Sequence, residues 1–314
     1  MAGWLGTYDF LLVSMTLGAM LALSLYLPLM SGQLSLASPA FYAIGGYIAA
    51  LLSTRVFTGL NPYPVPLVLG EMVLAALVCG LVGWGLGVPV LRLRGIYFAI
   101  ATIAFSEVLR VLALNLEVTG GAVGIFGIPQ PFSTPLGYLW LTLPLLIMVA
   151  IAIGHLEQTR AGKAMQAIRS DELVAQTLGI DTTHYKVLGF VLGAILAGVA
   201  GVLAAHLLNT WNPRQGTFDT GVLALTAVLI GGNRTFVGPI AGGILFTALP
   251  ELLRSLADQA YLPPPVATFC RDGRLMLYGL LIILGTRFFP RGLCQPLRWR
   301  SLWSILLGHQ TRKM

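Results

Sequence analysis

Long apolar runs, separated by short polar or glycine-rich stretches, are the dominant pattern along this chain. A helix needs about 20 apolar residues to cross the hydrocarbon core of a bilayer. Nine runs come near that length, at residues 9–30, 35–57, 66–91, 96–116, 137–156, 184–208, 218–233, 237–256 and 273–290. The pattern therefore predicts an all-α, polytopic transmembrane protein with eight or nine spans.

Two junctions in this pattern are unusual. The first two runs are separated only by "SGQLS" at 31–35, and the seventh run is short and ends in "IGGNRTFVGP". Irregular backbone at membrane depth is tolerated only where protein or a water-filled cavity covers it. We therefore expect broken or re-entrant helices at both places.

Composition supports a lipid environment. Of 314 residues, 56% are hydrophobic and only 10% are charged, whereas soluble domains carry roughly a quarter charged residues. The 37 glycines suit close packing of transmembrane helices. Cys79, Cys270 and Cys294 are too far apart for a metal-binding spacing, so no metal site is predicted. The first run lacks the basic residues and cleavage site of a signal peptide, so we interpret it as a retained helix.

Basic residues indicate an orientation. With segment 160–180 in the cytoplasm, thirteen of the nineteen lysines and arginines fall on the cytoplasmic side. They are Arg92, Arg94, Arg160, Lys163, Arg169, Lys186, Arg234, Arg287, Arg291, Arg298, Arg300, Arg312 and Lys313. Because cytoplasmic loops are enriched in Lys and Arg, this places the N-terminus outside and the C-terminus inside. The net charge of +7 then reflects membrane orientation, and no nucleic-acid partner is expected.

The segment "RAGKAMQAIRSDELVAQTLG", residues 160–179, is the most polar long stretch of the chain. Ser170 is predicted as a helix N-cap, with Asp171 and Glu172 in the first turn, where the helix dipole favours negative charge. Gly179 is predicted to end that helix. We therefore expect a capped helical hairpin or bent helix that docks a cytoplasmic partner; a solvated loop is the alternative.

Six segments, in this order, carry a family resemblance. They are "SGQLSLASPAFYAIGGYIAALL", "PVLRLRGIYFAIATIAFSEVLR", "TGGAVGI", "RAGKAMQAIRSDELVAQTLGID", "IGGNRTFVGPIAGG" and "FFPRGL". Together they resemble the LivM-type permeases of bacterial ABC importers for branched-chain and neutral amino acids, over about residues 30–293.

This resemblance implies a bacterial inner-membrane permease that works with a homologous second permease, two ATPase subunits and a periplasmic substrate-binding protein. It also implies that the polar segment contains a coupling helix, which docks in a groove of the ATPase. The residues expected to serve this coupling are Lys163, Arg169, Ser170, Asp171, Glu172, Val174 and Gly179. The chain has no phosphate-binding loop (G-x-x-x-x-G-K followed by Ser or Thr), so ATP and Mg²⁺ are expected on the partner ATPases. We expect no cofactor and no catalytic residue in this chain.

Polar residues within the apolar runs are candidates for the transport pathway, since such side chains usually face protein or a water-filled cavity. The candidates are Gln33, Ser35, Ser38 and Tyr42 near the first junction, and Glu107 and Arg110 in the fourth run. The alternatives are hydrogen bonds between helices for the first group and an ion pair that joins two helices for the second. Glu71 and the histidines are interpreted as residues of the membrane interface.

The glycine-rich segment after the fourth run is expected on the outer face. The resemblance implies that Thr119, Gly120 and Gly121 belong to a structured outer loop near the binding-protein interface, and an ordinary turn is the alternative.

The chain is assigned two domains, and two other functions compete with amino acid import. Residues 1–293 are assigned to a transmembrane permease domain, and 294–314 to a basic cytoplasmic tail whose pattern fits an amphipathic helix on the inner leaflet. A urea or short-amide importer is one alternative function. An ion-coupled secondary transporter is the other, but such proteins usually carry intramembrane acidic groups in repeated halves, and only Glu107 is central here.

Overall fold

The computed structural model describes residues 2–60, 62–93, 95–257 and 279–280. Among these, five helices are long and apolar enough to cross a membrane. They are α1 (Ala2–Met30), α3 (Val65–Val90), α4 (Ile96–Asn115), α5 (Pro135–Gln158) and α8 (Thr182–Leu208). The predicted run 273–290 and the predicted tail 294–314 lie outside the described residues, apart from 279–280.

Three further helices belong to the apolar part of the described fold. They are α2 (Ser38–Leu51), which continues as a π-helical turn (Leu52–Val56), α9 (Phe218–Gly231) and α10 (Val237–Ala257). Each of the first eight predicted runs therefore contains a helix, which confirms a mostly helical fold. The number of spans stays a prediction, because α2 and α9 are only 14 residues long and a helix of that length spans about 21 Å.

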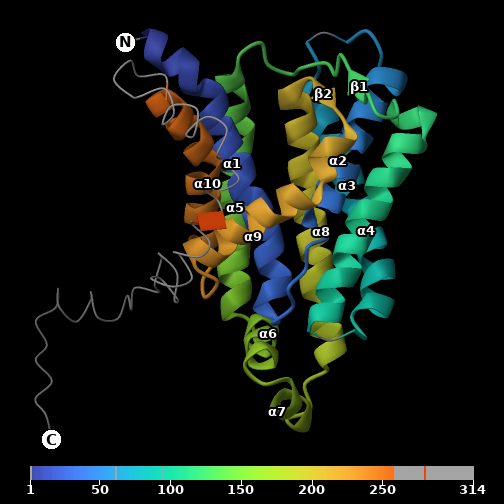
Figure 1. The fold of residues 1–314 in the computed structure, drawn as a ribbon, viewed down its shortest axis with the longest axis vertical. Coiled ribbons are helices and arrows are strands. Elements are labelled where there is room, and N and C mark those ends of the chain that lie inside the picture. Colours follow the sequence, from blue (N-terminus) through green and yellow to red (C-terminus); the bar gives the residue numbers. More distant parts are fainter. Residues whose placement is uncertain (1, 61, 94, 258–278, 281–314) are drawn as a thin grey trace, which may run out of the picture.

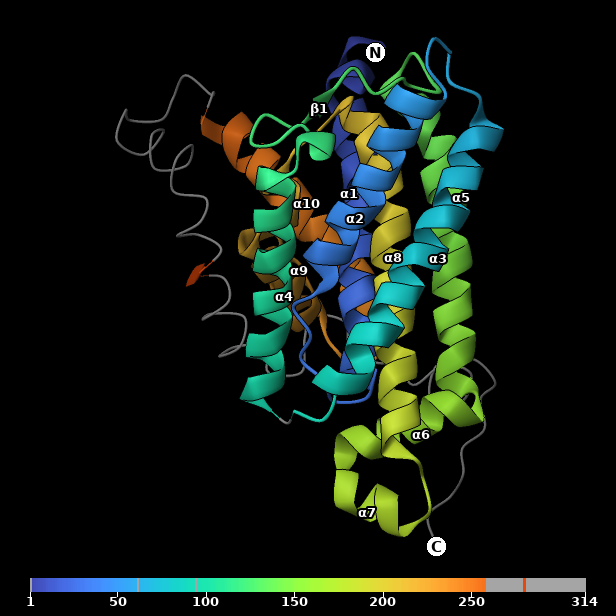
Figure 2. The ribbon, with the colours of Figure 1, turned by 90° about the vertical axis from the view of Figure 1, so that its right-hand side faces the viewer.

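Both predicted junctions are breaks between helices. The first break, residues 31–37, separates α1 from α2, and the second break, residues 232–236, separates α9 from α10. Figure 1 shows α9 near mid-height of the bundle, with α10 along its outer side. In the orthogonal view of Figure 2, α4, α9 and α10 lie on one side of the bundle and α3 and α5 on the other.

Helix α8 is central, and it packs against α1, α2 and α3. Glycines allow this packing because a Cβ at Gly45 would overlap the carbonyl group of Gly198, and one at Gly201 would overlap the carbonyl of Tyr42. The backbones of α2 and α8 therefore touch directly, as small residues permit between membrane helices.

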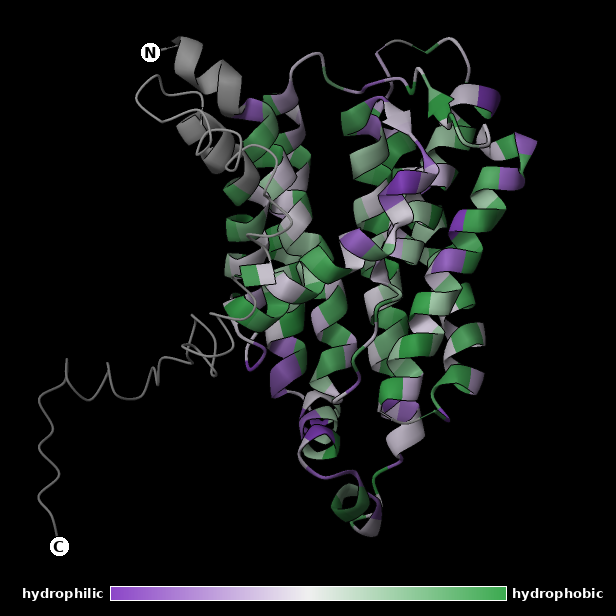
Figure 3. Ribbon diagram, in the orientation of Figure 1, coloured by the Kyte–Doolittle hydropathy of each residue, from purple (hydrophilic) through white to green (hydrophobic). Residues whose placement is uncertain are grey.

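The two ends of the bundle differ. At one end, helices α6 (Arg160–Ser170) and α7 (Glu172–Thr177) project beyond the long helices (Figure 1), and we call this the elbow end. The other end carries two short helical turns and a two-residue antiparallel ribbon, which the sequence pattern did not predict, and we call it the ribbon end. Its elements are η2 (Glu117–Thr119), η3 (Pro213–Gly216), β1 (Ile125–Phe126) and β2 (Thr210–Trp211). Figure 3 shows hydrophilic residues gathered towards both ends, with hydrophobic residues along the long helices between them.

Candidate functional site

We call α6, α7 and the residues up to Gly179 the elbow. It consists of two capped helices, as expected, but the N-cap of α7 differs from the prediction. Asp171 has an extended backbone, and its Oδ1 accepts hydrogen bonds from the amides of Leu173 (2.9 Å) and Val174 (3.1 Å). The prediction of Ser170 as N-cap is wrong: Ser170 is the last residue of α6, and its hydroxyl donates to the carbonyl of Gln166. A carboxylate at a helix N-terminus also gains from the helix dipole, which favours Asp171 over its neighbour.

Gly179 ends α7 as predicted. Its φ is +79°, a left-handed conformation that suits glycine. Its amide donates to the carbonyl of Gln176, and the next amide, of Ile180, donates to that of Ala175. This pair of bonds is the Schellman motif, so the elbow is an ordered structure in the described chain, not a solvated loop.

The capping arrangement yields a test with a neighbouring control. Asp171→Ala is expected to destabilise α7 by about 0.5–2 kcal/mol, because two amides lose their acceptor. Ser170→Ala should change little, because the Ser170 hydroxyl only donates to the Gln166 carbonyl within α6 and bonds to no amide of α7. Hydrogen exchange of the Leu173 and Val174 amides measures the difference. Faster exchange in the Ser170 variant than in the Asp171 variant would contradict the assignment.

Two elbow residues that were expected to be available to a partner are engaged within the chain. Glu172 forms an ion pair with Lys186 of α8, with 2.7 Å between Oε1 and Nζ. Arg169 is half-buried, and its Nη1 donates to the carbonyl oxygen of Asn233 at 2.6 Å. Burial lowers the pKa of the Arg169 guanidinium below its ordinary value. The elbow is thus fastened to α8 and to the second break.

The same part of α6 also meets the first break. Gly32 has a φ of +80°, and a Cβ there would lie 3.2 Å from the Cα of Arg169. Glu157, at the end of α5, accepts hydrogen bonds from the Tyr26 hydroxyl (2.7 Å) and the Phe236 amide (3.0 Å). The end of α5, helix α6, both breaks and α1 are therefore linked by direct contacts.

The outward side of the elbow has a different character. Leu173, Val174 and Leu178 are 66%, 53% and 73% exposed, and Lys163 is exposed as well. Large exposed apolar side chains beyond the ends of the long helices are candidates for contact with another protein. We call Leu173, Val174 and Leu178 the elbow tip.

A hydrogen-bonded joint links the first break to α4. The Leu36 amide donates to Thr102 Oγ1 (3.0 Å), and Ser106 Oγ donates to the Leu36 carbonyl (3.1 Å). On the elbow side of this joint lies a cleft of about 570 Å³. It is lined by Ser31, Gly32, Gln33, Leu34, Leu93, Gly95, Ile96, Phe98, Ala99, Ile168, Arg169, Ser170, Asp171, Glu172 and Lys186. We call it the elbow cleft.

The structure separates the predicted pathway residues. Gln33 lines the elbow cleft, and its buried Oε1 has no hydrogen-bond partner among the described residues. Ser35 is also buried, but its Oγ accepts a bond from the Ala37 amide. Ser38 is buried at the start of α2, and Tyr42 packs on Trp211 with ring centroids 5.3 Å apart. Only the first of these four therefore faces the cleft.

The ion pair predicted in the fourth run forms within one helix. Arg110 Nε lies 2.7 Å from Glu107 Oε2, and the two side chains are 35% and 39% exposed. Among the described residues, the pair is therefore confined to α4, and both side chains are partly exposed.

The interpretation of Glu71 and of the histidines as interfacial is wrong for one buried pair. Glu71 is 2% exposed and His206 is 0% exposed, and His206 Nε2 lies 2.6 Å from Glu71 Oε2. The Tyr63 hydroxyl donates to the other carboxylate oxygen of Glu71, and His206 Nδ1 lies 2.8 Å from the Pro129 carbonyl oxygen. Buried polar groups are tolerated when they are hydrogen-bonded in this way. No local pattern reveals this pair, because 135 residues separate its members.

At the ribbon end, the predicted outer-loop residues form an ordered turn. Thr119 Oγ1 donates to the carbonyls of Ala113 and Leu116, and Gly120 and Gly121 have φ of +77° and +58°. A Cβ at Gly120 would overlap the carbonyl of Gly124, so this turn requires glycine.

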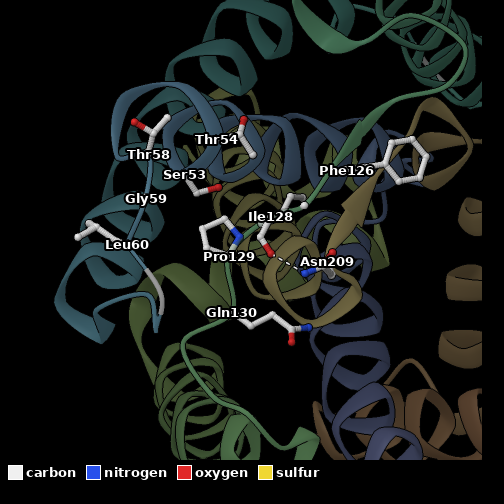
Figure 4. Close-up of a pocket in the computed structure, with 11 residues that line it drawn as sticks. Ser53, Thr54, Thr58, Gly59, Leu60, Phe126, Ile128, Pro129, Gln130 and Asn209 are labelled. Carbon is white, nitrogen blue, oxygen red and sulfur yellow. Dashed lines mark hydrogen bonds between the residues drawn. The ribbon is translucent and has the colours of Figure 1, made fainter.

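A cavity of about 590 Å³ lies at the ribbon end, next to β1 (Figure 4). It is lined by Ser53, Thr54, Thr58, Gly59, Leu60, Phe126, Gly127, Ile128, Pro129, Gln130 and Asn209. Asn209 has a φ of +58°, and its Nδ2 donates to the Ile128 carbonyl, as the dashed line shows. The cavity thus lies where the end of α8 meets the loop after β1, and we call it the ribbon cavity. Among the described residues, no group of three metal-ligating side chains is present.

Comparisons with known proteins agree on one family. Residues 7–285 match the family model described as "Branched-chain amino acid transport system / permease component". The chain is 32% identical over 285 residues to the high-affinity branched-chain amino acid transport system permease protein LivM of Salmonella typhimurium, and equally to LivM of Escherichia coli K12. These matches cover 81% of this chain but only 62% of each LivM protein. The LivH permease protein of Escherichia coli K12 is 30% identical, over 73% of this chain and 79% of its own length. No solved structure matches the chain.

Proposed function

Because the chain belongs to the family of permease components of branched-chain amino acid transport systems, we propose that it is a subunit of an ATP-driven importer. In this proposal it crosses the bacterial inner membrane and transports branched-chain or other neutral amino acids. A periplasmic binding protein delivers the substrate, and separate subunits hydrolyse ATP. The observation that carries the proposal furthest is the elbow, which has an exposed apolar tip and contacts with both helix breaks.

The elbow tip is proposed to dock in a groove of an ATPase subunit. Leu173, Val174 and Leu178 are exposed, and Figure 1 shows α7 projecting beyond the long helices. A docked ATPase would bury this apolar surface. Motion of the ATPase would then reach α8 through Glu172 and Lys186, and the breaks through Arg169.

The ribbon end is proposed to face the periplasm. Figure 1 places the start of α1 and the ribbon at the same end, opposite the elbow. Basic residues on the elbow and its adjoining loops are more numerous than those near the ribbon, which supports a cytoplasmic elbow under the positive-inside rule. The ribbon cavity, with its hydroxyl and amide side chains, is proposed to receive a loop of the binding protein.

A second, homologous permease is proposed as the partner within the membrane. Both LivM and LivH of Escherichia coli K12 are named as permease proteins of a high-affinity branched-chain amino acid transport system, and both are similar to this chain. The partly exposed ion pair on α4 also favours a covering partner, because a charged side chain exposed to lipid costs about 2.5–3.5 kcal/mol at a helix centre.

Reconstitution tests this function. We expect liposomes that contain this permease, a LivH-like permease, two ATPases and a binding protein to take up labelled leucine only with ATP. An ATPase variant without its phosphate-binding lysine should abolish uptake, and a protonophore should not. Uptake of urea but not leucine would change the substrate class, and uptake driven by an ion gradient without ATP would contradict the proposal.

A further inference from the structure

A groove lies between α2 and α4, apart from the elbow cleft and the ribbon cavity. It encloses about 240 Å³, which is below the roughly 300–1,000 Å³ typical of sites for drug-sized ligands. Its lining residues are Ala40, Ala43, Ile44, Tyr47, Ile48, Leu51, Ser106, Leu109, Arg110, Leu112, Ala113, Leu116, Thr119, Pro213 and Gly216. We call it the α2–α4 groove.

This groove continues the line of the elbow cleft. Along α4, Ile96 and Ala99 line the cleft, Thr102 and Ser106 bond to Leu36, and the residues from Ser106 to Leu116 line the groove. The order is the same before and within α2: Gln33 and Leu34 line the cleft, Leu36 forms the joint, and residues from Ala40 to Leu51 line the groove. The Leu36 joint therefore lies between the ribbon-side groove and the elbow-side cleft.

Four polar residues line the groove; the hydroxyls of Ser106 and Thr119 donate to backbone carbonyls, whereas Arg110 and Tyr47 have polar atoms without a partner in the described chain. Arg110 lines it, and only the guanidinium Nε is committed to Glu107, so the terminal nitrogens have no partner among the described residues. Glu107 is not itself a lining residue, but it is bonded to Arg110, and its Oε1 has no partner in the described chain. Tyr47 also lines the groove; it is 9% exposed, and its hydroxyl has no hydrogen-bond partner among the described residues.

An unpaired buried hydroxyl costs free energy, which a ligand that bonds to it would recover. Arginine binds carboxylates with its terminal nitrogens, and a neighbouring carboxylate binds ammonium groups. Aliphatic residues such as Ile48 and Leu109 surround these groups. One small solute matches all of these features, namely a zwitterionic amino acid with an aliphatic side chain. A lipid acyl chain would use the apolar walls alone.

We propose that the α2–α4 groove is a transit site that holds the transported amino acid on the ribbon side of the Leu36 joint. This inference rests on the proposed import function and locates its substrate within the chain. Arg110 receives the carboxylate, Glu107 the ammonium group, and the Tyr47 hydroxyl bonds to the carboxylate. The aliphatic side chain lies against α2 and α4.

The test uses a leucine analogue with a photoreactive diazirine side chain, added to the reconstituted complete complex. We expect labelling of peptides from 40–51 and 106–116, and excess unlabelled leucine should compete. Tyr47→Phe should reduce this labelling about tenfold while raising thermal stability slightly, because it removes a hydroxyl that is unpaired in the empty protein. Arg110→Gln should reduce labelling at least as much, and Arg110→Lys should restore part of it. Tyr97→Phe, at a residue that is 72% exposed and outside the groove, is the matched control.

Each other outcome overturns something specific. If the wild-type complex imports leucine with ATP but the label falls elsewhere, the site is wrong and the import function stands. Label in the groove that leucine does not displace indicates an acyl chain, and label on a partner helix that fills the groove indicates a permease interface. Both results overturn the site. Absence of ATP-driven import by the wild type overturns the proposed function itself.

Discussion

Replacement of Glu172 by lysine is expected to reduce transport at least tenfold while the ATPase subunits remain bound. Glu172 forms a 2.7 Å ion pair with Lys186, whose side chain is only 11% exposed. The variant would place two ammonium groups in contact, and it would put a positive charge in the first turn of α7, where the dipole disfavours it. Removal of one partner from a buried pair costs about 3–5 kcal/mol, and we expect less here because Glu172 is 30% exposed.

A charge swap separates this link from a general loss of structure. The double variant Glu172→Lys, Lys186→Glu restores opposite charges across α7 and α8, so it should recover a substantial part of leucine uptake. ATPase binding to the membrane complex is measured alongside uptake, because the exposed elbow tip is unchanged in both variants. Wild-type uptake by the single variant, or equal loss in the single and double variants, would show that this pair does not couple the elbow to α8.

Replacement of Gly45 by alanine is expected to lower the stability of the helix bundle substantially. The added Cβ would overlap the Gly198 carbonyl, so α2 and α8 must move apart. Overpacking of a protein interior costs about 1–3 kcal/mol. We expect the upper part of this range because the obstructing atoms of Gly198 belong to the backbone, which cannot move aside as a side chain can. Thermal unfolding of the purified permease in detergent measures the loss.

Gly70→Ala in α3 is the matched control for this effect. A Cβ there meets no described heavy atom within 4 Å, and alanine is favoured over glycine within a helix by about 0.5–1 kcal/mol. The control should therefore be as stable as the wild type or slightly more so. Equal destabilisation by both substitutions would show that contact between α2 and α8 is not the cause.

The sequence predicted features that depend on neighbouring residues. Apolar runs located the helices, "SGQLS" and "IGGNRTFVGP" located the breaks, and Gly179 ended α7 where only a left-handed residue suits the turn. The spacing of Glu107 and Arg110 likewise predicted a pair on one helix face. These features are set within one or two helical turns, which is the range over which a sequence pattern is informative.

Features that depend on the packing of distant segments were missed. The contact between Glu71 and His206 exists because α3 lies against α8, and neither helix carries a sign of its partner. The joint between Leu36 and α4 spans 66 residues for the same reason. The choice of Asp171 over Ser170 as a cap was missed for a different reason: both residues favour that position, and the backbone angle that decides between them is not visible in composition.

The position of Arg169 between the two breaks has a thermodynamic consequence. Linkage between two binding events is reciprocal: if one changes the affinity for the other, the reverse change has the same factor. Arg169 of α6 contacts Gly32 and Asn233. If a docked ATPase and a solute each prefer one arrangement of the breaks, each would change the affinity for the other by the same factor. A coupling of about 1–3 kcal/mol corresponds to a change in affinity of roughly 5–150-fold. If the ATPase docks on the elbow as proposed, an amino acid within the membrane would alter how tightly the ATPase subunits are held without touching them.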